Sequence, residues 1–564
     1  MTLKRVLWAL VCAITALAVA AVAVPYVPAD FLRPSIERAL EHGLGRKVDV
    51  GEIRLTLFPG PLPRPGITLA GVIIHEDPRA GIEPLAHVES LGASIRVLSL
   101  FRHRLEFSSL NLEDATINVV KTDAGPWNFQ FLLENGAANA NPIPSIRMRA
   151  GRVNFKFGDT KALFYFNDAD LDVAPYADGS VELRFGGAPS RTDRSAQDFG
   201  RFFLRGTAAP GSRRLDLQVD LERSSLEETL HWIDPNGFGV HGTVALSAQL
   251  SGPPSRLDVS GQMQVADVHR WDLLPNDGGG LKVGFGGTLD LRGERLDLQT
   301  TASPGSSPVV VRFRSWDFLK TPHWDAGADL QQVPLATLLA IGRHMGAALS
   351  EKMEAQGAVS GSVTYNQQEG MQGRVVLRDA SLTVPDAEPV EAPVATVDIA
   401  GRSVILESTS VHIGEKQSAD VEGSYNLEPP RSLDLKITTR GLSVDATRSF
   451  GLEAIPLLDQ SPQGTWRGWV RYLDGGWSGE SELQNARIAV DGLADPLLIK
   501  YAAVSLNGTR VALSRLQAQA GTISITGSYR REPDAEPSEK ARPDRFDLKI
   551  GEADAAELSR LLAP

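Results

Sequence analysis

The stretch RRLDLQVDLER, residues 213–223, alternates leucine or valine with charged and amide side chains. Successive side chains of a β-strand point to opposite faces, so this alternation predicts a strand with one apolar and one polar face. Similar stretches are GADLQQVPLATLL from residue 327, RSLDLKITTRGLSVDA from 431 and DRFDLKIGEADAAELSRLL from 544. Each is followed by apolar residues at helical spacing, and residues 225–228 have the spacing of a capping box. The chain therefore repeats a strand followed by a short helix.

The repeat has a period of about 110 residues, because the central aspartates of the four stretches, Asp216, Asp329, Asp434 and Asp547, are 113, 105 and 113 positions apart. Three further segments, GTVALSAQL at 242, GAVSGSVTY at 357 and GTWRGWVRYL at 464, each open a unit. We therefore predict a leading β-rich segment over residues 29–241, followed by repeats over 242–356, 357–463 and 464–564. Each repeat is expected to hold about six strands and one helix.

Alternation of period two predicts a mainly β fold built from an antiparallel sheet with one apolar face. Such a sheet can close into a sandwich or stay open as a long gutter, and the alternation alone favours the closed core. The candidates for the apolar face are Leu215, Leu217, Val219, Leu289, Leu291, Val404, Leu406, Val511, Leu513, Ile523 and Ile525.

The N-terminus predicts export. Lys4 and Arg5 precede residues 6–24, an uncharged and mostly apolar run close to the length that crosses a bilayer as a helix. The basic residues favour an N-terminus in the cytoplasm and a body outside it, with residues 1–28 as a short cytoplasmic stub and anchor. The alternative is a cleaved signal peptide ending near Ala23. A helical pattern then runs from Phe31 and is expected to end near Gly43. That helix lies against the membrane, plugs one end of the sheet, or simply caps a sheet end.

Composition and motifs exclude several classes of function. Lys and Arg total 57 against 69 Asp and Glu, a net charge of −12, and no basic stretch is interleaved with aromatics, so nucleic acid is a poor partner. The Gly-rich residues 237–242 follow a turn and lead into a strand, the reverse of a dinucleotide site. Glu228 and His231 form a single pair, and residues 386–393 form an acidic turn rather than a calcium site. We expect no catalytic residue, metal or cofactor, and so no enzyme.

The N-terminal residues resemble the AsmA family of Gram-negative bacteria, whose TamB and YhdP relatives are much longer. The similar positions are Gly45, Arg46, Val48 and Pro59, the cadence from Arg102 to Leu112, and Gly125 with Asn128; Ala115 stands where a proline is usual. The general pattern of the family covers nearly the whole chain.

This resemblance implies an inner-membrane protein with a single span and a periplasmic body. It also implies a curled apolar β-groove for phospholipid acyl chains moving towards the outer membrane, or a role in outer-membrane biogenesis generally. The resemblance therefore favours the open gutter over the closed sandwich, the opposite of what the alternation alone favours. Two alternatives stay open: a non-catalytic envelope scaffold that assembles outer-membrane proteins, and an exported enzyme with dispersed residues.

Overall fold

The structure is a computed structural model. It describes residues 29–58, 64–76, 83–96, 105–121, 144–157, 164–176, 178–192, 198–209, 214–231, 239–269, 280–301, 308–318, 322–344, 351–414, 417–427, 432–450, 463–488, 493–508, 510–531 and 544–562, with the single positions 8, 11, 12, 14–16, 19, 99, 101, 127 and 128.

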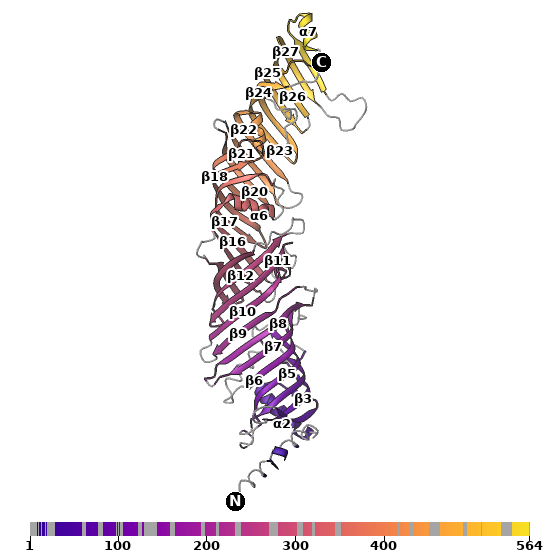
Figure 1. Ribbon diagram of the computed structural model, residues 1–564, viewed down its shortest axis with the longest axis vertical. Coiled ribbons are helices and arrows are strands. Elements are labelled where there is room, and N and C mark those ends of the chain that lie inside the picture. The colour runs from indigo at the N-terminus through magenta and orange to yellow at the C-terminus, as the bar shows by residue number, and fades with distance from the viewer. Residues whose placement is uncertain are drawn as a thin grey trace, which may run out of the picture. The chain divides into compact units, whose positions relative to one another are not determined.

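The chain divides into two compact units. The first comprises Met1–Trp271, Pro275–Thr301 and Phe313–Trp324, and the second Asp272–Leu274, Ala302–Arg312 and Asp325–Pro564. Figure 1 shows the strands of each unit side by side in chain order. The prediction of a mainly β fold is confirmed.

The first unit contains strands β1–β14. Strands β1 and β2 both pair antiparallel with β3, and from β3 to β14 consecutive strands pair antiparallel with one exception: β5 and β6 are parallel, with Leu110 opposite Ile146. The expectation of a wholly antiparallel sheet is therefore wrong at this pair. The bounds are β1 (Val48–Asp49), β2 (Ile53–Phe58), β3 (Arg64–Ile74), β4 (Ala86–Ile95), β5 (Phe107–Lys121), β6 (Ser145–Phe157), β7 (Phe164–Pro175), β8 (Val181–Arg191), β9 (Phe202–Ala209), β10 (Arg214–Ser225), β11 (His241–Gly252), β12 (Leu257–His269), β13 (Gly280–Asp290) and β14 (Arg295–Thr300).

The second unit continues the same pattern, and β15 (Val309–Trp316) and β16 (His323–Pro334) have residues in both units. From β16 to β28 every consecutive pair is antiparallel. Within the described residues no pairing joins the first and last strands of either unit, so each sheet is open and the closed sandwich is wrong. The bounds are β17 (Glu354–Asn366), β18 (Gly370–Thr383), β19 (Val390–Gly401), β20 (Ser403–Ile413), β21 (Gln417–Asn426), β22 (Leu433–Ser443), β23 (Gln463–Leu473), β24 (Gly476–Ile488), β25 (Leu497–Asn507), β26 (Arg510–Ala520), β27 (Ile523–Arg531) and β28 (Asp544–Ile550).

Short helices follow the strands that the sequence repeats: α5 (Leu226–Leu230) follows β10, α6 (Leu335–His344) follows β16, the 3-10 helix η3 (Asp445–Phe450) follows β22, and α7 (Ala555–Leu561) follows β28. Six strands therefore lie between successive helices. The Ser225 side chain accepts a hydrogen bond from the Glu228 N–H at 3.3 Å, which is the expected N-cap. The repeat boundaries at 241, 356 and 463 stay a prediction.

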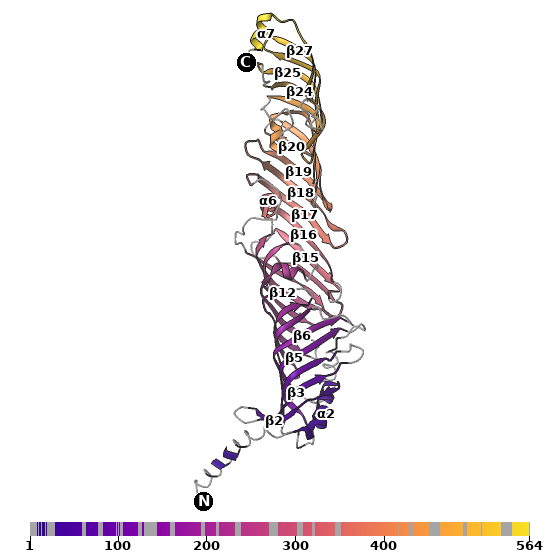
Figure 2. The ribbon, with the colours of Figure 1, turned by 90° about the vertical axis from the view of Figure 1, so that its right-hand side faces the viewer.

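The N-terminal helix α2 (Arg33–Leu44) follows the 3-10 helix η2 (Asp30–Leu32). It ends at Leu44 and is capped by Gly45, whose φ of 64° lies in the left-handed region that glycine adopts without strain, so the glycine that stops the helix lies two residues after the predicted Gly43. Ile36 and Leu40 are 0% and 5% exposed, and both belong to the buried cluster of the first strands. Helix α2 therefore covers the sheet end beside β3 (Figure 2).

β-Bulges interrupt many of the strands. From β10 onward an extra residue falls on β10, β12, β16, β18, β20, β22, β24 and β26. Nearer the N-terminus it falls on β5, β6 and β7. A bulge bends its strand and increases its twist. Apolar residues on either side of it keep to one face although they are three apart, as Leu513 and Leu516 do. In the sequence, such a bulge corresponds to two polar residues in succession inside an alternating stretch, and the sequence analysis did not predict the bulges.

An alanine at positive φ gives a test of this backbone. Ala150 on β6 has a φ of 50°, a conformation in which its Cβ is strained. Ala150→Gly is expected to raise the free energy of unfolding by about 0.5–1 kcal/mol, because glycine relieves that strain. The matched change Ala174→Gly, on extended β7 backbone, should lower it by about the same amount. Urea unfolding of both variants measures this, and a loss of stability in Ala150→Gly would contradict the bulge.

The polar face carries cross-strand ion pairs. Arg471 Nε donates to Asp434 Oδ1 at 2.6 Å, and Arg312 Nη2 lies 2.7 Å from Asp329 Oδ2, so two of the four repeated aspartates pair with an arginine of a neighbouring strand. The Arg471 hydrogen bond lowers the pKa of Asp434 below its ordinary value. These pairs place the repeated aspartates on the face away from the apolar residues.

Candidate functional site

A continuous apolar face runs through the first unit. On β10 it presents Leu215, Leu217, Val219 and Leu221, which lie opposite Gly252, Leu250, Ala248 and Leu246 of β11. The register carries it on to Val259 and Met263 of β12, and to Leu289 and Phe285 of β13. On the other side of β10 it continues through Leu204 and Phe202 of β9. We call this surface the apolar face in both units.

The predicted residues of the first unit lie on this face with one exception. Leu289 is opposite Leu257 of β12 and Leu296 of β14. Leu291 lies beyond the end of β13, in the turn to β14, and is 38% exposed. The alternating pattern of the sequence therefore continues past Asp290, the last residue of strand β13.

All six predicted residues of the second unit lie on the apolar face. Val404 and Leu406 of β20 are opposite Tyr425 and Gly423, and Val511 and Leu513 of β26 are opposite Leu506 and Val504. Ile523 and Ile525 of β27 are opposite Ala520 and Ala518. Val511 is 1% exposed and Ile523 is 3% exposed, so the face is largely covered here.

The apolar face differs in coverage along the chain. At the N-terminal end, helix α2 closes a buried cluster, and in the second unit Ala446 and Phe450 of η3 pack into another. The described apolar residues of β10–β14 belong to none of the buried clusters. Val244, Ala248, Leu257 and Val259 are buried, most of the others are half-buried, and Leu281 at the start of β13 is 64% exposed. This part of the face meets solvent.

One ion pair shows that the first sheet curls towards its apolar face. Lys121 at the end of β5 pairs with Glu294 in the turn between β13 and β14, and their side chains are 9% and 12% exposed. In a flat sheet these strands would be about 38 Å apart, from eight steps of about 4.8 Å. Lys121 lies on the same side of β5 as Val119, which packs against the apolar cluster. The apolar face is therefore the inner side of the curl.

Two residues of the N-terminal resemblance meet at a buried carboxylate. Asn128, 0% exposed, donates to Glu76 Oε2 at 2.5 Å, and Arg46 Nη2 lies 3.4 Å from Glu76 Oε1. The Asn128 side chain also accepts from Val120 N–H at 3.0 Å and donates to Asn118 O at 2.8 Å. Strand β4 begins opposite Ile117 of β5, and Asn128 supplies hydrogen-bond partners to the next residues of β5, which β4 does not reach. These contacts fix Asn128 beside β5, at a described point of the chain that leads on to the parallel strand β6, which is a structural role. Gly125 and Pro59 lie outside the described residues.

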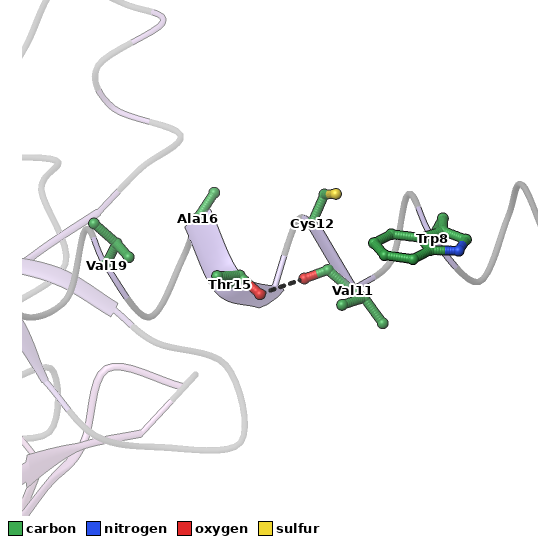
Figure 3. A pocket seen from close by; sticks show the side chains of 6 residues that line it. All are labelled: Trp8, Val11, Cys12, Thr15, Ala16 and Val19. Atoms are coloured by element: carbon green, nitrogen blue, oxygen red, sulfur yellow. Dashed lines mark hydrogen bonds between the residues drawn. The ribbon is translucent and has the colours of Figure 1, made fainter.

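The predicted anchor, residues 6–24, lies mostly outside the described residues. Figure 3 shows six described side chains of this stretch, in which Thr15 Oγ1 donates to Val11 O at 2.8 Å. Trp8, Ile14 and Val19 are 70%, 59% and 62% exposed. Among the described positions, no helix is both long enough and apolar enough to cross a membrane.

The Glu228–His231 pair and the end of the glycine-rich residues 237–242 are parts of the fold. His231 Nδ1 contacts the backbone oxygen of Glu227 at 2.8 Å, and Glu228 is 9% exposed on the same helix. Strand β11, not a helix, begins at the end of the glycine-rich residues 237–242. Within the described part of the chain, no group of three or more His, Cys, Asp or Glu residues is placed to hold a metal ion.

These features define a class of protein: in each unit, an open β-sheet of many strands with an apolar and a polar face, and short helices at regular intervals along the chain. Residues 2–184, about a third of the chain, match the family model described as the AsmA family, so this N-terminal part of the chain is similar to that family. No curated protein and no solved structure is significantly similar to it. The AsmA family is associated with the bacterial envelope and is not known for enzymes.

Proposed function

We propose that this chain is an inner-membrane-anchored periplasmic protein whose apolar face carries phospholipid acyl chains towards the outer membrane. The observation that supports this most is the apolar face of β10–β14, where most of the described apolar residues are half-buried and none belongs to a buried cluster, although Val244, Ala248, Leu257 and Val259 are buried. A face that only held the sheet together would be covered by other side chains.

The energetics fit an acyl chain. Each methylene removed from water contributes about 0.8 kcal/mol, so a chain of about 16 carbons gains on the order of 10 kcal/mol on an apolar track. The headgroup stays in water at the open margin of the sheet. Transfer along such a track needs no catalytic residue. The anchor over residues 6–24 would hold the first unit near the membrane from which lipid departs.

Site-specific photo-cross-linking tests the proposal. A photoreactive amino acid at Leu217 or at Leu289, in full-length protein in the native envelope, is expected to capture phospholipid through its acyl chains, as mass spectrometry would detect. The matched control is Gln249, an exposed residue opposite Gln218 on the polar face of β11.

Capture at Gln249 as strong as at Leu217 would contradict a track on the apolar face. If no position captures lipid and the purified protein carries none, the envelope-scaffold alternative replaces the lipid proposal.

A further inference from the structure

A polar cleft of about 780 Å³ lies in the second unit, where the connection between β18 and β19 meets η3. Its charged lining residues are Lys352, Glu354, Asp386, Glu388 and Asp445. Four carboxylates therefore face one ammonium group, and the cleft has a net negative charge. Such a lining attracts a ligand that carries a positive charge.

A second, independent feature of the cleft indicates a ligand. Ser449 of η3 lines it and is 1% exposed, and among the residues that the structure describes its Oγ has no hydrogen-bond partner. Buried hydroxyl groups nearly always have a partner, because leaving one unpaired is destabilising. An unpaired donor and acceptor at the wall of a cleft of this size is typical of a site whose partner is a bound molecule.

The lining of the cleft suits an organic cation better than a metal ion. The described acidic residues here do not converge in a group of three or more that could hold an ion. Carboxylates spread around a cleft suit an ammonium group, which donates up to three hydrogen bonds in different directions. Lys352 adds a positive charge at the same cleft, which suits a phosphate.

The cleft adjoins the apolar face. Ala446 of η3 lines it, is 7% exposed, and belongs to the same buried cluster as Ile413 and Leu442 of the neighbouring strands. The cleft therefore opens at the edge of the covered part of the apolar face, and the residues that line it are suited to the polar head of a ligand.

We propose that this cleft binds the zwitterionic phosphoethanolamine headgroup of a phospholipid. Asp386 and Glu388 accept hydrogen bonds from its ammonium group, Lys352 pairs with its phosphate, and Ser449 Oγ completes the contact. This inference rests on the proposed lipid function, and it adds a preference for one headgroup.

The test uses full-length protein in a neutral maltoside detergent and a probe without acyl chains, sn-glycero-3-phosphoethanolamine, titrated by calorimetry. We expect it to bind at least tenfold more tightly than sn-glycero-3-phosphoglycerol, which has the phosphate but no ammonium group. The double change Asp386→Asn with Glu388→Gln should weaken binding tenfold or more. Asn tolerates the positive φ of 59° at residue 386. Glu391→Gln, on β19 and outside the cleft lining, is the matched control and should bind as the wild type does.

Ser449→Ala separates a ligand contact from a structural role. Removal of an unpaired buried hydroxyl should leave Tm unchanged or raise it, while binding of the headgroup weakens about threefold. Unaltered affinity in this variant and in the double variant would overturn the proposal, as would absence of binding to the wild type. If spermidine binds as tightly and is lost in the same variants, the site takes free polyamines and the headgroup assignment is wrong. Because the probe lacks acyl chains, its binding is independent of cross-linking at Leu217, so either proposal can fail alone.

Discussion

Ile437→Asp is expected to unfold much of the second unit, whereas Leu217→Asp should leave the first unit folded. Ile437 is 1% exposed on β22, between Val421 and Val470 of the neighbouring strands. A carboxylate there has no partner, so it costs several kcal/mol or forces protonation. That is a large share of the roughly 5–15 kcal/mol that stabilises a folded domain. Leu217 is half-buried and outside the buried clusters, so a carboxylate at this position can remain hydrated.

Urea unfolding followed by tryptophan fluorescence and circular dichroism measures the first effect. The controls place the same charge on the polar face: Ser418→Asp on β21, an exposed residue opposite His412, and Gln249→Asp on β11 opposite Gln218. Both should stay within about 0.5 kcal/mol of the wild type. Leu217→Asp should also interrupt the apolar track and reduce lipid capture at Leu289 severalfold. If it abolishes cooperative unfolding as Ile437→Asp does, the first unit has a closed core and the track does not exist.

Asn128→Ala is expected to lower the free energy of unfolding of the first unit by about 3–5 kcal/mol. The change removes three side-chain hydrogen bonds and leaves Val120 N–H, Asn118 O and the Glu76 carboxylate each short of a partner inside the protein. Each buried polar group left unsatisfied costs about 1–3 kcal/mol. Asn128→Asp should cost more, because it sets a second carboxylate against Glu76, whose side chain is 2% exposed.

Chemical denaturation of the full chain checks this effect, with Asn111→Ala as the control because Asn111 is a half-buried residue near the start of the same strand β5. The control should change stability by less than about 0.5 kcal/mol. An Asn128→Ala protein as stable as the control would show that these contacts of Asn128 do not stabilise the first unit. The motif residue would then need a role outside the fold.

The strands could be predicted from the sequence because their side chains alternate with a period of two over long stretches. Leu215, Leu217 and Val219 are assigned to one face by that period alone, and the structure places them there. The short helices after the repeated strands could also be predicted from the sequence, since Ser225 caps α5 as its spacing predicts. The helix end at Gly43 and the position of Leu291 were missed by one or two residues, because local patterns continue past the last paired residue.

The parallel direction of the β5–β6 pair could not be predicted from the sequence, because side chains alternate in the same way in parallel and antiparallel strands. The direction depends on where the connecting chain is held, and Asn128 fixes one described point of it through contacts with Glu76 and β5, residues that lie 52 and 8 positions away in the sequence. The bulges had a visible signal, as in Leu513-Ser514-Arg515-Leu516, but two polar residues in a row can also mark the end of a strand.

By itself, the amino-acid sequence determined that this protein consists of repeated amphipathic strands with an apolar and a polar face, since each face follows from the order of neighbouring residues. Only the tertiary structure decided which parts of the apolar face are covered. Coverage depends on contacts between distant segments: Ile36 of α2 against the first strands, Phe450 of η3 against those of the second unit, and Lys121 against Glu294 across the curl. Such contacts leave no periodic signal along the chain, so the less covered stretch over β10–β14 appears only when the chain is folded.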